Sequence, residues 1–97
     1  MVRELQLTCH GQYLELAGER GGAAVTIPVR NGLIDQAVRE LAGEIRRRVE
    51  SWGPVMRDGR WEPVLSVRVS ADGESRFRQL EMLMRNSGVR VERKRTR

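Results

Sequence analysis

The chain has few residues whose chemistry could support catalysis. Its one cysteine and one histidine are neighbours, Cys9 and His10, at the end of a run in which apolar and polar residues alternate. In a β-strand their side chains would point to opposite faces, so they could not ligate one metal ion or act as a nucleophile and base. Cys9 is expected to be a small buried hydrophobic residue and His10 a solvent-facing residue at a strand end.

The second candidate for chemistry is a pair of carboxylates, Asp72 and Glu74, at the start of a predicted helix. Helix capping and the helix dipole explain acidic residues at this position. The Gly21-Gly22 pair lacks the strand-to-helix context that a phosphate-binding loop requires. We therefore predict that the protein is not an enzyme, and we predict no cofactor and no metal site.

Positive charge is the third candidate, because the 97 residues include 18 basic and 13 acidic ones. Four of the basic residues fall in the last five positions, which leaves 14 basic against 13 acidic residues in the rest of the chain. Arginine-rich tails bind polyanions weakly, without sequence choice and in a strongly salt-dependent way. The candidate polyanion contacts are Arg46, Arg47, Arg48, Arg93, Lys94, Arg95 and Arg97.

Short strands are predicted where apolar and polar residues alternate. These runs cover residues 5–9, 13–16, 25–29, 64–69 and 89–91. Pro28 lies in the third run and has no N–H to donate, so we expect this strand at an edge of the sheet. The fourth run is apolar on both faces near its start, which is typical of a central strand.

Two helices are predicted from apolar residues that recur at spacings of three and four. The first covers Leu33–Trp52, and the second has a predicted buried stripe of Phe77, Leu80, Leu83 and Met84. With the strands, they predict a two-layer α+β sandwich, in which both helices pack on one face of a mixed sheet of four or five strands. The expected order is β-β-β-α-β-α-β. Residues 1–92 would form a single domain, and residues 93–97 a basic, disordered tail.

A family resemblance covers residues 64–91. A strand ending in VRVSAD, a helix containing FRQLEMLM and the sequence NSGV follow one another there. This unit resembles the C-terminal half of the soluble domain of the ExbD/TolR family of biopolymer-transport accessory proteins. The matching positions are Arg68, Ala71, Asp72, Leu80, Met82, Leu83, Gly88 and Val89.

The resemblance implies a periplasmic-type α+β domain, usually dimeric, in an envelope energy-transduction complex. Members of that family have an N-terminal membrane helix with an acidic residue used in proton passage. This sequence has no apolar run near the ~20 residues of a membrane span and no signal-peptide core. No motor function or ion-conducting residue can therefore be transferred to it, and no compartment is predicted.

The preferred interpretation is a non-catalytic protein-interaction or assembly domain, related to the soluble part of an envelope complex but without its membrane helix. Open strand edges favour pairing with a second copy, so we expect a homodimer. The candidate interface residues are Val89, Val91 and Trp61, although Trp61 could instead cover the core. The alternative is a small nucleic-acid-binding module that uses the arginine-rich helix end and tail. The chain has only four aromatic residues to stack on bases, which makes nucleic acid the less favoured partner.

Overall fold

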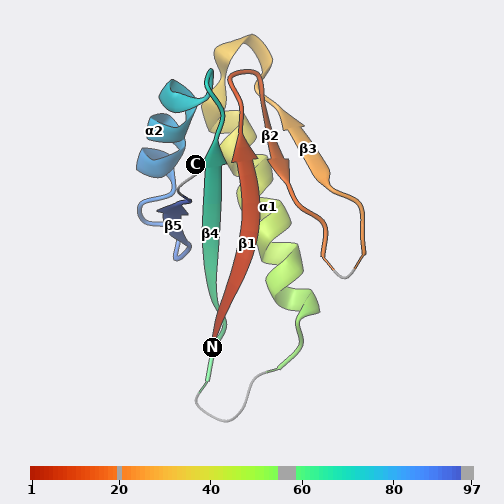
Figure 1. Ribbon diagram of the computed structural model, residues 1–97. Helices are drawn as coiled ribbons and strands as arrows, with labels where there is room; N and C mark the ends of the chain where they lie inside the picture. The colour runs from red at the N-terminus through yellow and green to blue at the C-terminus, as the bar shows by residue number, and fades with distance from the viewer. Residues whose placement is uncertain (20, 55–58, 95–97) are drawn as a thin grey trace.

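The computed structural model describes residues 1–19, 21–54 and 59–94, which form a five-stranded sheet and two helices (Figure 1). The helices are α1 (Ile34–Ser51) and α2 (Glu74–Leu83), and a 3-10 turn, η1 (Arg30–Gly32), precedes α1. The predicted α+β class and the predicted order of elements are confirmed. The strands are β1 (Val2–Cys9), β2 (Tyr13–Leu16), β3 (Val25–Pro28), β4 (Glu62–Val69) and β5 (Arg90–Arg93).

The sheet is mixed and has the order β3-β2-β1-β4-β5. β1 runs parallel to β4, and β4 runs parallel to β5, whereas β2 is antiparallel to both of its neighbours. Each helix therefore connects two parallel strands, and both connections cross the sheet in the same direction. Right-handed crossovers of this kind place both helices on one face, where α1 and α2 contact each other.

The hydrophobic core lies between the sheet and the two helices. In β1, Leu5, Leu7 and Cys9 point into this layer and are at most 2% exposed. The apolar stripe of α1 packs onto them, so the helix predicted over Leu33–Trp52 is confirmed to within one residue at each end. The residues that α1 and α2 bury, with Met84 directly after α2, are Ile34, Ala37, Val38, Leu41, Ile45, Arg48, Phe77, Leu80 and Met84. The prediction that Leu83 is also buried is wrong: it is 47% exposed, because a residue six positions after Phe77 lies on another side of the helix.

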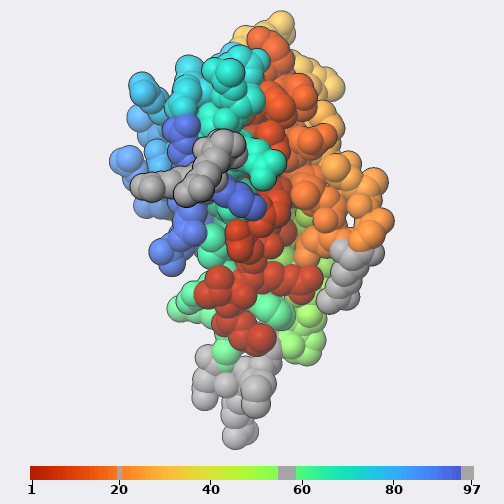
Figure 2. Space-filling model, viewed as in Figure 1, coloured from red at the N-terminus to blue at the C-terminus, as the bar shows by residue number. Residues whose placement is uncertain are grey.

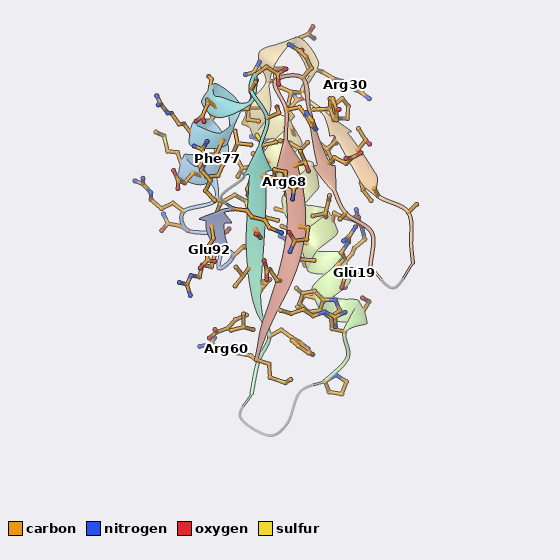
Figure 3. The ribbon with its side chains drawn as sticks, in the orientation of Figure 1. Glu19, Arg30, Arg60, Arg68, Phe77 and Glu92 are labelled. Atoms are coloured by element: carbon orange, nitrogen blue, oxygen red, sulfur yellow. The ribbon has the colours of Figure 1, made fainter. Side chains whose placement is uncertain are left out.

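Neither of the two described helices covers the opposite face of the sheet. Side chains of β1 and β2, red and orange in Figure 2, form much of this face. Glu4 and Gln6 of β1 are exposed there, and Arg68 of β4 lies across the same face in Figure 3. The face is therefore polar, as expected for a sheet that packs on one side only.

The last strand extends beyond the predicted end of the domain at residue 92. β5 includes Arg93, and the Lys94 N–H donates to the Val67 carbonyl at 2.7 Å. Arg93 also forms an ion pair with Glu74, which holds it in the strand. The prediction that Arg93 belongs to a disordered tail is therefore wrong. The remainder of the predicted tail, residues 95–97, lies outside the described residues. Neither described helix is long and apolar enough to cross a membrane.

Candidate interaction edge

Cys9 and His10 do not form a chemical site. The Cys9 thiol is fully buried and lies 3.7 Å from the Gly73 carbonyl oxygen. Burial raises the pKa of this thiol from 9.0 to about 11, so it is a poor nucleophile at neutral pH. The His10 ring instead stacks on the Tyr13 ring at 4.2 Å on the turn between β1 and β2. The prediction that Cys9 is buried is confirmed.

Asp72 and Glu74 also do not act as a pair, because each carboxylate has a different partner. α2 begins after Gly73 without a side-chain cap, so the predicted capping role of Asp72 is wrong. The Asp72 carboxylate instead accepts a hydrogen bond from the Ser70 hydroxyl at 2.6 Å, and this bond and one from the Gly11 N–H lower its pKa. Glu74 lies in the first turn of α2 and pairs with Arg93 of β5. Among the described residues, no group of three or more His, Cys, Asp or Glu side chains could hold a metal ion.

The three consecutive arginines near the end of α1 do not form one basic surface. Arg48 is only 8% exposed, donates to the Ala17 carbonyl at 2.6 Å and lies near the carboxylates of Glu44 and Glu19. Arg47 is on the exposed side of the helix and pairs with Glu44 at 2.6 Å. Arg46 lines a shallow hollow on another side of the helix. The structure therefore separates these candidate polyanion contacts.

The two tryptophans cover one end of the core. The rings of Trp52 and Trp61 meet edge to face at 5.3 Å, and the Trp61 indole N–H donates to the Gly53 carbonyl at 2.8 Å. The Arg3 guanidinium lies 4.5 Å from the centre of the Trp52 ring. These contacts place Trp61 as a cover over the core, which was one of its two predicted roles. Val89 and Val91, the other candidate interface residues, are partly buried and pack against the same core.

Among the described residues, no strand pairs with the outer side of β5, so its backbone forms a free edge. Peptide groups of successive strand residues point to alternate sides, so one observed hydrogen bond fixes the direction of all of them. Because the Lys94 N–H donates to Val67 of β4, the peptide groups of Glu92 and Arg90 also point to β4. Those of Val91 and Arg93 must point outward, away from the sheet.

The other edge strand, β3, offers fewer donors. The Val29 N–H donates to the Gln12 carbonyl at 2.8 Å, so the peptide groups of Ile27 and Val25 also point inward to β2. The peptide groups of Thr26 and Pro28 therefore point outward, and Pro28 has no N–H. Within β3 this leaves a single outward N–H, that of Thr26. A proline at such a position is a known way in which sheets prevent edge pairing.

A groove runs beside the free edge of β5. It has a volume of about 380 Å³ and lies between the end of α2 and the strand. Glu92 lies on the opposite face of β5 (Figure 3). The groove is lined by Glu81, Met84, Arg85, Val89, Arg90 and Val91. The sequence indicated that β5 was short, but it contained no signal for which of its peptide groups would face outward.

Searches against protein-family models, curated proteins and solved structures found no match to this chain.

Proposed function

We propose that this chain is a non-catalytic protein-interaction domain that forms a homodimer through the free edge of β5. The observation that supports this proposal is the difference between the two sheet edges. Val91 and Arg93 present two outward N–H groups on β5, whereas β3 presents only that of Thr26. Strand addition at an open edge is a common mode of protein recognition.

The resemblance to the ExbD/TolR family supports a role in assembly. The matching stretch, residues 64–91, folds into most of β4, all of α2 and the start of β5. The stretch that resembles the family is therefore also the unit that builds the free edge. We propose that the domain acts as the assembly part of an envelope energy-transduction complex.

A nucleic-acid-binding function has less support. Arg48 is buried, Arg47 is paired with Glu44, and Arg93 is paired with Glu74. Charges that are already neutralised by neighbouring carboxylates release few counterions from a polyanion, so they contribute little to its binding. These pairings favour a protein partner over a nucleic acid.

The substitution Val91→Pro tests the proposed function. It removes an outward N–H and leaves the hydrogen bonds between β4 and β5 intact, because the peptide group of residue 91 does not face β4. A short edge buries much less than the ~1,200 Å² of a stable interface, so association of the wild type is expected to be weak. We expect the average mass, measured by sedimentation from micromolar to millimolar protein, to rise for the wild type and to stay monomeric for Val91→Pro.

Two variants are matched controls. Val91→Ala removes most of the same side chain but keeps the N–H, so it should still associate. Thr26→Pro places a proline at the outward position of β3 and should also associate like the wild type. A wild type that stays monomeric at millimolar concentration would contradict the homodimer. A Val91→Pro protein that unfolds like the wild type but still associates would show that β5 is not the contact.

A further inference from the structure

We infer that the two copies pair β5 to β5 in antiparallel orientation, with Val91 of one copy directly opposite Val91 of the other. This inference rests on the proposed function and adds the alignment of the two strands. A two-fold axis makes each copy present the same edge to the other, which requires antiparallel strands. The outward peptide groups of Val91 would then exchange two hydrogen bonds, as a hydrogen-bonded pair of an antiparallel ladder does.

Charge selects this alignment. With Val91 at the centre, Arg90 of each copy lies directly opposite Glu92 of the other, and both side chains are on the helix-free face. Within one chain Arg90 and Glu92 already form an ion pair at 3.0 Å. The dimer would thus bring four charges of alternating sign together at the two-fold axis. Opposite charges at directly opposed positions stabilise a strand pair.

The other alignments place like charges together. Centring the pair on Glu92 puts two glutamates face to face and Arg90 opposite Lys94. Centring it on Arg90 or on Arg93 puts two arginines face to face. Like charges at directly opposed positions destabilise a strand pair. Among alignments centred on a residue of β5, only the one on Val91 avoids such a contact.

The helix side of the edge fits the same alignment. Opposed residues of an antiparallel pair point to the same face, so both Val91 side chains would lie on the helix side. There they adjoin the groove lined by Met84 and Val89 of each copy. The rim of that groove includes Glu81 of α2 and Arg85, which follows the helix. The apolar contact between the two Val91 side chains would therefore lie on the helix side of the sheet. The Arg90–Glu92 pairs would lie on the helix-free face.

A charge-exchange experiment tests the alignment. Arg90→Glu produces a chain with glutamate at positions 90 and 92, and Glu92→Arg produces a chain with arginine at both. Each change converts two attractive pairs into two repulsive ones. We expect each variant alone to dimerise at least about tenfold more weakly than the wild type. An equimolar mixture should dimerise again, because all four charges are then complementary. The double variant R90E/E92R should restore homodimers.

The outcomes separate the alignment from the proposed function. If both single variants dimerise like the wild type while Val91→Pro does not, the alignment is wrong and edge pairing stands. The same conclusion holds if neither the mixture nor the double variant restores association. If the wild type does not associate, both proposals fall. Thermal unfolding of each variant checks that loss of the intrachain Arg90–Glu92 pair has not unfolded the chain.

Discussion

At the scale of single residues, burial decides what Cys9 can do. The thiol lies in the layer between sheet and helices and is fully inaccessible. A charged thiolate would lose its hydration there, which is the main reason why its pKa rises to about 11. Cys9 is therefore a core residue whose ionisation opposes folding.

This shift predicts a loss of stability at high pH. The pKa of Cys9 is raised from 9.0 to about 11, so the unfolded chain releases its thiol proton before the folded chain does. The contribution of the neutral Cys9 thiol to stability is fully present below pH 9 and is lost as the pH rises from about 9 to 11. In urea unfolding, we expect the wild type to lose about 2 kcal/mol more than Cys9→Ala between pH 8 and pH 11. Equal losses of unfolding free energy in both proteins would show that ionisation of Cys9 does not cause the loss.

Arg48 illustrates a residue whose role the sequence only partly indicated. Three consecutive arginines look alike, and all three were predicted as polyanion contacts. Arg48, however, lies three residues after Ile45 and seven after Leu41, so it continues the buried stripe of α1. That spacing was a usable signal. Its hydrogen bond to Ala17 and its approach to Glu19 depend on the loop after β2, which periodicity does not locate.

The same contacts predict different costs for neighbouring arginines. Arg48→Ala removes the side-chain donor to the Ala17 carbonyl and the buried guanidinium near Glu19 and Glu44, so we expect a loss of about 2–4 kcal/mol in the free energy of unfolding. Arg46→Ala removes an exposed side chain and should change stability by less than about 0.5 kcal/mol. Urea unfolding of both variants measures this difference. Similar losses would mean that Arg48 does not stabilise the core.

At the scale of elements, a glycine allows α2 to begin close to the end of β1. A Cβ added to Gly73 would overlap the carbonyl oxygen of Cys9. The backbone at Gly73 has an ordinary φ of −100°, so the requirement is one of space and not of conformation. Gly88, which precedes β5, is the opposite case, with a φ of +83° and no atom near the added Cβ.

This contrast predicts two kinds of destabilisation. Gly73→Ala forces α2 away from β1 and should destabilise the fold by more than about 2 kcal/mol, as overpacking does. Gly88→Ala should cost only about 1 kcal/mol, from the left-handed conformation. Denaturant midpoints of the two variants give the comparison. If Gly88→Ala proved the more damaging, close packing of α2 on β1 would not be the limiting contact.

At the scale of the whole molecule, hydrophobic periodicity was enough to predict two layers and the order of the elements. Alternation marked the strands, and the three-and-four spacing marked both helices. Pro28 correctly indicated an edge strand. The extension of β5 to Arg93 was not predicted, because four basic residues in the last five positions suggested a solvated tail. Its ion pair with Glu74 joins residues 19 positions apart, which no local pattern reveals.

The proline in β3 also sets an upper limit on the size of any assembly. A sheet that is open at both ends can accept a new copy at each end, and such growth continues into fibres. Here β3 is the less open of the two ends, because it presents a single outward N–H, that of Thr26, whereas β5 presents those of Val91 and Arg93. In the proposed dimer both remaining ends would be β3 strands, which offer a third copy fewer backbone donors than β5 does. Assembly through β5 would then stop at two copies, and a residue at the far side of the sheet from the contact would set this limit.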